Sequence, residues 1–226
     1  MELTRNCAAV IPCFNEAATN RRVVTGVRQH LTKVIVVDDG SRDGTSAEAT
    51  AAGAEVVRLE KNLGKGAALR AGWRRAAEMG CSWVLMLDGD GQHSADDIPR
   101  FLGRGGRGDA SLVVGNRMDS AREMPLVRRW VNRWMSRRIS NLTRLEIPDS
   151  QCGFRLARLQ PLLELSLRPN RFEIESAMLV AFATAGLKIE FVPIQTIYGT
   201  RRSHIRPVAD TWRWLRWRFE QVNYPR

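Results

Sequence analysis

Short apolar runs alternate with helix-forming segments along the first half of the chain, and this alternation constrains the fold more than any other feature. The runs read as buried parallel strands and cover residues 7–11, 34–37, 55–58, 83–87 and 112–115. Segments with helical period or Ala-rich composition lie between them, over residues 16–30, 44–52, 64–79 and 95–103. Such alternation predicts an α/β fold with a doubly wound, mostly parallel sheet.

The second half of the chain has fewer strand signals and more basic helical segments. Helices are predicted over residues 125–145 and 171–185, and a strand over residues 189–192. A basic loop, residues 199–204, then leads into a Trp- and Arg-rich terminal helix. No internal repeat or low-complexity linker divides the 226 residues, so we expect a single domain.

The charge balance indicates an anionic partner. The chain has 35 Lys and Arg against 24 Asp and Glu, a formal net charge of +11, which suits nucleic acid, an anionic membrane or a phosphorylated substrate. The four cysteines are scattered without a C-x-x-C pair, which argues against a zinc site or a disulfide framework. With neither a signal-peptide pattern nor a membrane-spanning apolar stretch, the sequence predicts a cytoplasmic protein.

Acidic and small polar residues follow three of the predicted strands, at residues 12–16, 38–45 and 88–93. Ligands of doubly wound sheets bind beyond the carboxyl ends of the strands, so these loops are expected to line one site. Each loop alone is also ordinary turn and helix-capping material. The segment at residues 62–66 lacks the spacing of a phosphate loop and is predicted to start a helix, with Lys65 near the site.

The paired carboxylates of Asp88 and Asp90 are the hardest of these residues to explain structurally. On extended backbone both side chains would point the same way, and like charges held that close need a cation between them. Gln92 continues the spacing and adds a neutral oxygen. Because oxygen ligands suit Mg²⁺ or Mn²⁺, we predict a metal site formed by Asp88, Asp90 and Gln92 that neutralises a diphosphate leaving group.

The order of these motifs resembles that of family 2 glycosyltransferases of the GT-A fold. Within that family the chain looks like the polyprenol-phosphate (dolichol-phosphate) mannose synthases, whose later motifs match residues 115–117, 149–155 and 172–175. Each motif is weak alone, but the ordered set is specific and extends over residues 7–206. The resemblance implies a Rossmann-like, nucleotide-sugar-binding fold with a helical, basic C-terminal elaboration.

The resemblance also implies roles for parts of the chain and for individual residues. Residues 1–117 would bind the nucleotide sugar, residues 118–206 would form the acceptor side, and residues 207–226 would form a basic aromatic terminal helix. The implied donor-binding residues are Pro12, Phe14, Glu16, Asp39, Ser41, Lys65, Asp88, Arg117, Arg201 and Arg202. The implied catalytic residues are Asp90, Arg117 and Asp149.

The implied reaction is an inverting transfer of a sugar from a GDP- or UDP-sugar to a membrane-associated acceptor. A lipid phosphate is already an anionic nucleophile, whereas a hydroxyl acceptor needs a carboxylate to take its proton. Asp149 is the candidate base for a hydroxyl, unless it only caps the following turn or orients Arg155.

Two other classes of protein rank lower. A sugar nucleotidyltransferase would carry a Gly-rich, basic loop at residues 12–16, where this chain has Pro-Cys-Phe-Asn-Glu. A nucleic-acid-binding protein would show salt-dependent binding of a polyanion, which the acidic loops oppose. We therefore expect no nucleic-acid partner.

Two Trp- and Arg-rich segments indicate contact with a membrane surface. Apolar residues repeat at helical spacing between residues 126 and 142 with arginines among them, and residues 212–219 repeat this composition. Arg stems can lie along apolar surface while their heads reach lipid phosphates. One such helix alone would more simply pack on the core with a basic rim. The two together predict a peripheral protein on the cytoplasmic face of an anionic membrane.

Overall fold

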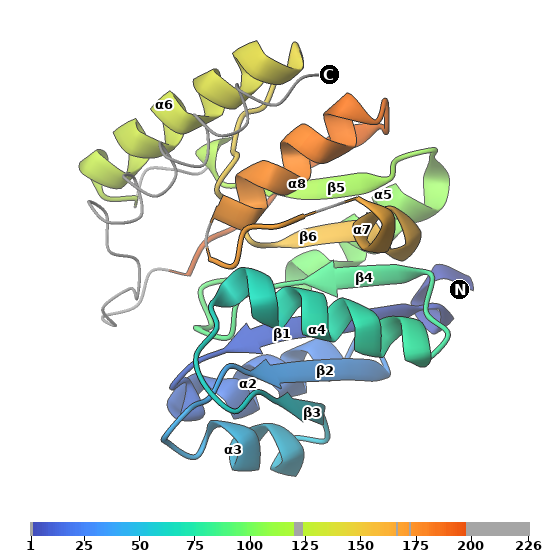
Figure 1. Ribbon diagram of the computed structural model, residues 1–226, viewed down its shortest axis with the longest axis vertical. Coiled ribbons are helices and arrows are strands. Elements are labelled where there is room, and N and C mark those ends of the chain that lie inside the picture. Colours follow the sequence, from blue (N-terminus) through green and yellow to red (C-terminus); the bar gives the residue numbers. More distant parts are fainter. Residues whose placement is uncertain (1, 120–123, 166, 172, 198–226) are drawn as a thin grey trace.

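The computed structural model describes residues 2–119, 124–165, 167–171 and 173–197 of the chain. A seven-stranded sheet of order β3-β2-β1-β4-β6-β5-β7 forms its centre (Figure 1). The strands are β1 (Cys7–Cys13), β2 (Lys33–Asp38), β3 (Glu55–Arg58), β4 (Trp83–Met86), β5 (Leu112–Asn116), β6 (Arg155–Arg158) and β7 (Ile189–Pro193). Only β6 among them runs antiparallel to its neighbours, β4 and β5.

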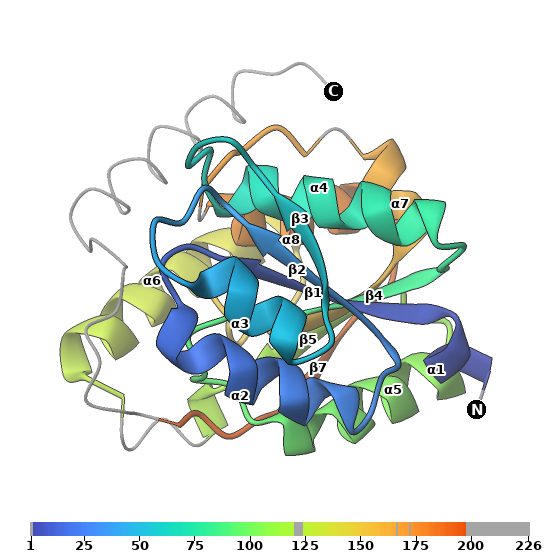
Figure 2. The ribbon, with the colours of Figure 1, turned by 90° about the horizontal axis from the view of Figure 1, so that it is seen from below.

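Helices cover both faces of this sheet, as the edge-on view in Figure 2 shows. One face carries α4 (Lys65–Glu78), α7 (Leu159–Glu164) and α8 (Glu173–Thr184). The other carries α1 (Glu2–Arg5), α2 (Ala17–Arg28), α3 (Thr45–Ala51), the 3₁₀ turn η1 (Ala95–Asp97) and α5 (Ile98–Arg107). The prediction of an α/β fold with a doubly wound, mostly parallel sheet is therefore confirmed.

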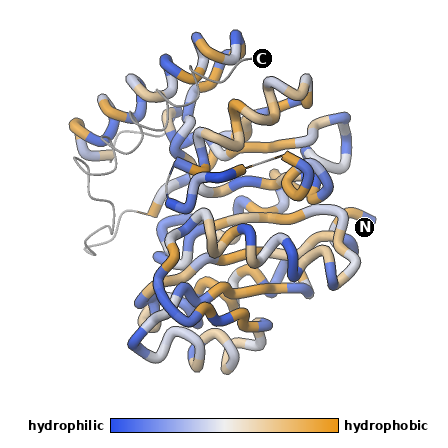
Figure 3. The backbone as a smooth tube through the Cα atoms, in the orientation of Figure 1, coloured by the Kyte–Doolittle hydropathy of each residue, from blue (hydrophilic) through white to orange (hydrophobic). Residues whose placement is uncertain are grey.

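The central strands are apolar throughout because neither of their faces meets water. All residues of β4 and β5 are buried, and in β1 only Pro12 is partly exposed. Figure 3 shows the same strands as largely hydrophobic segments through the middle of the molecule. This is why the sequence shows continuous apolar runs rather than the alternation of a sheet with one wet face.

The remaining helix, α6 (Leu126–Thr143), projects at one end of the molecule and packs against α8 (Figure 1). It presents Asn132, Met135, Ser136 and Ile139 to the interior. The apolar repeat predicted for residues 126–142 therefore divides between two sides of the helix, since Leu126, Val127, Trp130, Trp134 and Leu142 are exposed. Among the residues that the structure describes, no helix is long and apolar enough to cross a bilayer.

Three elements were not predicted from the sequence, namely α1, β6 and α7, and the helix expected over residues 95–103 continues to Arg107. The basic loop at residues 199–204, with Arg201 and Arg202, and the terminal helix at residues 207–226 lie outside the described residues. The other predicted helices and strands agree with the structure to within a few residues at each end.

Candidate active site

The carboxyl ends of β1, β2 and β4 point to the same side of the sheet, toward the left in Figure 1. Several hydrogen bonds join the loops after β1 and β2. Among them, the backbone N–H of Asn15 donates to Ser41 Oγ at 2.9 Å, and that of Glu16 donates to Thr45 Oγ1 at 2.9 Å. Thr19 Oγ1 lies 2.8 Å from the carbonyl oxygen of Gly89, which adds the loop after β4. The three polar loops thus form one cluster, as predicted.

The carboxylate of Asp39 joins this cluster to the start of α4. It accepts the backbone N–H groups of Leu63 at 2.7 Å and of Gly64 at 2.8 Å. Burial raises the pKa of Asp39, while these two hydrogen bonds oppose that rise. The result is that residues 62–66 lie beside the strand ends and that Lys65 begins α4 there, as predicted.

Lys65 and Asp88 form the centre of the cluster. Lys65 Nζ lies 2.5 Å from Asp88 Oδ1 and 2.6 Å from Glu175 Oε1 of α8, while His93 Nε2 lies 3.6 Å from Asp88 Oδ2. Burial disfavours the charged carboxylate of Asp88, but Lys65 and His93 outweigh it and hold its pKa well below the usual range. Asp88 is therefore anionic, with about a third of its side chain exposed.

Asp90 does not continue the extended backbone of β4, so the sequence-based expectation of two carboxylates on one side of a strand is wrong. Pairing between β1 and β4 ends at Val10 and Met86, and residues 89–90 form a turn that Gly91 continues with φ of 74°. Asp90 Oδ1 accepts the backbone N–H of Gln92 at 3.0 Å. Burial, and then the charge of Asp88, raise the pKa of Asp90, so the two acids still interact.

Asp88, Asp90 and Gln92 offer the kind of oxygen donors that a divalent cation shared with a substrate would use. Within the described ranges, no group of three or more His, Cys, Asp or Glu side chains is arranged to hold a metal ion. Mg²⁺ commonly binds through one or two carboxylates together with substrate phosphates, so it needs no such group.

Asp149 is fully buried and held by a bidentate ion pair with Arg117. Arg117 Nε lies 2.7 Å from Asp149 Oδ2, and Arg117 Nη2 lies 2.9 Å from Asp149 Oδ1. Asn132 of α6 and the backbone N–H of Gln151 also donate to Oδ1, at 2.9 and 3.1 Å. Burial opposes ionisation, but Arg117 and the hydrogen bonds lower the pKa of Asp149.

Arg155 is a separate structural group. Its guanidinium donates to the backbone carbonyls of Cys152, Glu175 and Ser150 at 2.7 to 2.9 Å. Asp149 therefore caps the turn at Gln151 and orients Arg117, whereas backbone carbonyls hold Arg155.

Sequence reasoning gave no role to Glu175, Thr19 or Asn132, although each contacts a predicted site residue. A signal was present for Glu175, because α8 is otherwise mainly apolar and a buried acid on such a helix needs a partner. Nothing in the sequence distinguishes Thr19 or Asn132 from ordinary helix residues, since Gly89 and Asp149, to which they also donate, come from distant loops.

The last described residues lie against the loop after β4. The backbone N–H of Ile197 donates to the carbonyl oxygen of Gln92 at 2.9 Å, and His93 forms a bridge with Thr196. Arg201 and Arg202, which were predicted to bind the donor, follow in the sequence but lie outside the described residues.

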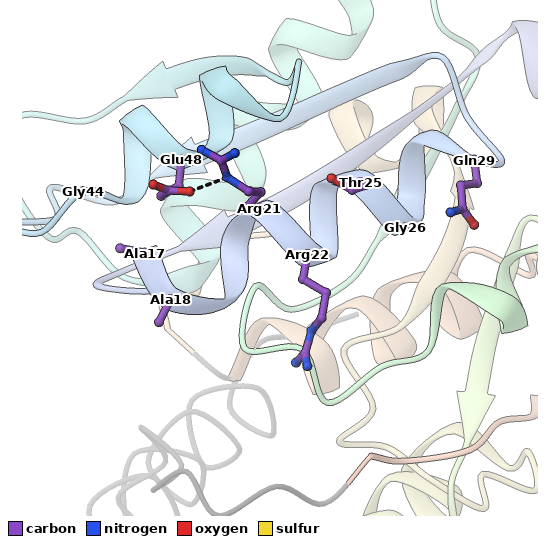
Figure 4. A pocket seen from close by; sticks show the side chains of 9 residues that line it. All are labelled: Ala17, Ala18, Arg21, Arg22, Thr25, Gly26, Gln29, Gly44 and Glu48. Carbon is purple, nitrogen blue, oxygen red and sulfur yellow. Dashed lines mark hydrogen bonds and ion pairs between the residues drawn. The ribbon is translucent and has the colours of Figure 1, made fainter.

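A hollow of about 900 Å³ lies elsewhere, along the outer side of α2 (Figure 4). Its rim includes the ion pair of Arg21 with Glu48 at 2.7 Å. None of the predicted site residues lines it. The polar loops at the strand ends, rather than this hollow, are therefore the candidate active site.

Comparisons with known proteins show which family the chain resembles. The family model described as Glycosyl transferase family 2 matches residues 8–165. The UDP-N-acetylglucosamine–dolichyl-phosphate N-acetylglucosaminyltransferase of Methanococcus voltae is 31% identical over 84% of this chain and 84% of its own length. The undecaprenyl-phosphate 4-deoxy-4-formamido-L-arabinose transferase of Pseudomonas paraeruginosa is 33% identical over 67% of this chain and 46% of its own length.

Among solved structures, glucosyl-3-phosphoglycerate synthase of Mycobacterium tuberculosis with Mn²⁺, UDP and glucosyl-3-phosphoglycerate has a TM-score of 0.68 and 26% identity. That similarity covers 94% of this chain and 76% of the synthase chain. The ordered motifs, the sheet and the matched family model lead to one conclusion: the chain belongs to glycosyl transferase family 2.

Proposed function

We propose that this glycosyltransferase moves a sugar from a nucleoside-diphosphate sugar to a lipid phosphate. The observation that carries the choice of acceptor is the state of Asp149, the only carboxylate that the sequence offered as a base. It is fully buried, paired with Arg117 and has a lowered pKa. A group of this kind is poorly placed to accept a proton, which favours an acceptor that needs no base.

The loops at the strand ends are the proposed donor site. Pro12, Phe14 and Glu16 at the end of β1, with Asp39 and Ser41 after β2, would hold the base and ribose. Arg117, with Arg201 and Arg202 beyond the described residues, would hold the phosphates, and Lys65 would lie beside them at Asp88. The relative from M. voltae and the M. tuberculosis synthase are named with UDP or a UDP-sugar, so a UDP-sugar is the first donor to test and a GDP-sugar the second.

Asp88, Asp90 and Gln92 would bind Mg²⁺ or Mn²⁺ together with the diphosphate. A bound divalent cation supplies positive charge that stabilises the departing nucleoside diphosphate. The chain's own residues orient the donor: Asp88 is fixed by Lys65 and His93, and Asp90 is fixed by the turn at Gln92. Arg117, held in one orientation by Asp149, would bind phosphate in the fork geometry that guanidinium groups favour.

In the proposed reaction an oxygen of the acceptor phosphate attacks the anomeric carbon of the sugar. The bond between that carbon and the diphosphate oxygen breaks, and the nucleoside diphosphate leaves with the electron pair. Because attack comes from the side opposite the leaving group, the anomeric configuration inverts. No proton has to be removed from the acceptor, since the phosphate is ionised near neutral pH.

A lipid acceptor also gives a role to the exposed side of α6. Trp130 is 73% exposed, Val127 72% and Leu126 65%, and Arg133, Arg137 and Arg138 on the same helix are exposed as well. Arg138 lies over the ring of Trp134 at 5.3 Å. Figure 3 shows hydrophobic and hydrophilic turns mixed along α6. We infer that this side lies on an anionic membrane, on its cytoplasmic face, beside the acceptor's lipid chain.

The test is a transfer assay that varies the acceptor head group while the donor and Mn²⁺ are kept constant. A short-chain polyprenyl phosphate, the matching polyprenol and 3-phosphoglycerate are each supplied with labelled UDP-sugars and then GDP-sugars. We expect sugar transfer to the polyprenyl phosphate and none to the polyprenol, which offers only a hydroxyl. Asp90→Asn is expected to abolish transfer while the protein stays folded.

Transfer to the polyprenol at an equal or higher rate would overturn the choice of acceptor. Transfer to 3-phosphoglycerate alone would give the chain the same acceptor as the synthase that it resembles in structure. If no nucleotide sugar is used and UDP or GDP with Mn²⁺ leaves the melting temperature unchanged, the proposed donor site is wrong as well.

A further inference from the structure

Lys65 occupies a position on Asp88 that a divalent cation would also need. Its ammonium nitrogen contacts Asp88 Oδ1 at 2.5 Å and Glu175 Oε1 at 2.6 Å, and only 11% of its side chain is exposed. The acidic cluster therefore already contains one cation, supplied by the protein.

Glu175 has an unused acceptor next to this ion pair. One of its oxygens binds Lys65, whereas the other, Oε2, is buried without a hydrogen-bond partner among the described residues. A buried carboxylate oxygen in that state is costly and unusual. Glu175 can therefore accept a second hydrogen bond from Lys65, because the ammonium has three N–H donors on a flexible side chain.

The backbone at Gly153 packs against one side of the ion pair between Lys65 and Asp88. A Cβ atom at Gly153 would lie 2.6 Å from Asp88 Oδ2 and 2.8 Å from Lys65 Nζ, so the main chain packs directly against both charged groups. Lys65 contacts both acids at once, so it would still be paired with Glu175 if a divalent cation took its place on Asp88.

We propose that Lys65 is a positioning residue that occupies the cation's place on Asp88 in the donor-free enzyme, and that it gives up Asp88 and keeps Glu175 when a metal–nucleotide complex binds. The inference rests on the proposed donor site. It predicts that the two ligands bind cooperatively. The free protein binds divalent cations weakly, and the nucleoside diphosphate strengthens cation binding. Glu175, which does not contact the substrate in this account, acts by holding Lys65 after the exchange.

Mn²⁺ binding, followed by electron paramagnetic resonance with and without UDP, tests the exchange without any turnover. Lys65→Met is expected to raise the Mn²⁺ affinity of the nucleotide-free protein roughly tenfold, equivalent to about 1.4 kcal/mol. The factor by which UDP strengthens Mn²⁺ binding should shrink correspondingly. Lys188→Met, which removes the same charge from a half-exposed pair with Asp109 at the far end of the sheet, should leave both affinities unchanged.

The double variant Lys65→Met/Glu175→Gln separates exchange from a simple change in net charge. It removes one positive and one negative charge together, so the net charge of the cluster stays as in the wild type. The balance of buried positive and negative charge is also unchanged, which favours folding of the variant. If Lys65 competes for Asp88, this variant still binds Mn²⁺ more tightly than the wild type without nucleotide. Affinity equal to or below that of the wild type would overturn the inference.

The same titration distinguishes this inference from the proposed function. If the wild type binds Mn²⁺ in the presence of UDP but the Lys65 variants do not differ from it, only the exchange is wrong. If the wild type binds no Mn²⁺ even with UDP, both the exchange and the donor site are wrong. Thermal melts of each variant check that the compared proteins are folded.

Discussion

The buried charges of the site are fixed by different kinds of partner. Asp149 is neutralised by Arg117, whereas the guanidinium of Arg155 is surrounded by backbone carbonyls. Lys65 lies between two acids. A buried charge is costly unless it is paired and hydrogen-bonded, so each of these groups also fixes the loop or helix that supplies its partner.

Asp149→Asn should destabilise the protein and change how its stability depends on pH. Loss of one partner leaves Arg117 buried without its counter-ion, which costs roughly 3–5 kcal/mol of the free energy of unfolding at neutral pH. The folded-state pKa of Asp149 is lowered, so its carboxylate stabilises the fold above the unfolded value of about 3.9. That contribution is lost as the pH falls through the folded-state value.

Urea denaturation of the wild type and the Asn variant at a series of pH values checks this. The difference between the two proteins should be greatest near neutral pH and shrink as the pH falls below about 4. A constant difference over that range would contradict the proposed ion pair. Asp96→Asn, at an exposed position, serves as a control that should change the stability little.

Gly153→Ala should weaken nucleotide and metal binding together. The added Cβ would lie 2.6 Å from Asp88 Oδ2, closer than such contacts allow, and Asp88 or the loop must move. We expect isothermal titration to show at least about tenfold weaker binding of UDP with Mn²⁺, a loss of about 1.4 kcal/mol. Gly103→Ala is the matched control, because nothing lies within 4 Å of its added Cβ; unchanged binding in Gly153→Ala would show that Asp88 is not held there.

At the scale of elements, the strands and helices with strong periodicity were predicted correctly, because apolar runs of β1, β2, β4 and β5 are buried on both faces. The strand β6 was missed because its sequence, Arg155-Leu-Ala-Arg158, has charged residues at both ends. Tertiary partners compensate: backbone carbonyls bind Arg155, and Arg158 lies over the ring of Trp83 at 4.8 Å. Local sequence carries no signal for such partners.

The site was predicted to the level of its loops but not of its contacts. Chain order and strand ends were enough to bring residues 12–16, 38–45 and 88–93 together. The bridge from Lys65 to Glu175 was not predictable, since it depends on how α8 packs beside α4. The turn at Gly89 and Asp90 was also missed, because strand pairing ends earlier than the apolar run does.

Helix α6 is expected to bind membranes through its exposed side. Trp130→Ser combined with Trp134→Ser removes two exposed aromatic side chains but leaves the buried Asn132 and Met135 in place. Because burial of one large apolar side chain contributes roughly 1.5–3 kcal/mol, binding to anionic vesicles should weaken at least about tenfold in a flotation assay. Leu163→Ser on α7, where Leu163 is 47% exposed, is the matched control; equal loss in both variants would contradict a role for α6.

At the scale of the whole molecule, charge is unevenly distributed. The chain carries a formal net charge of +11, yet the loops after β2 and β4 concentrate acids at the strand ends. The acids suit a cation shared with a diphosphate, and the excess of Arg and Lys elsewhere suits an anionic surface. Two different electrostatic interactions, one local and one spread over the surface, are therefore expected to respond differently to salt.

Salt should release the protein from membranes while nucleotide binding remains. The screening length is about 10 Å at 0.1 M salt and about 3 Å at 1 M, and exposed charges are screened far more than buried pairs. We expect binding to anionic vesicles to fall steeply between these concentrations, with little binding to zwitterionic vesicles at either. The rise in melting temperature produced by UDP with Mn²⁺ should change much less, because Lys65 and Asp149 are largely enclosed. If vesicle binding depends on neither the salt concentration nor the charge of the lipid, the positive surface does not bind the membrane.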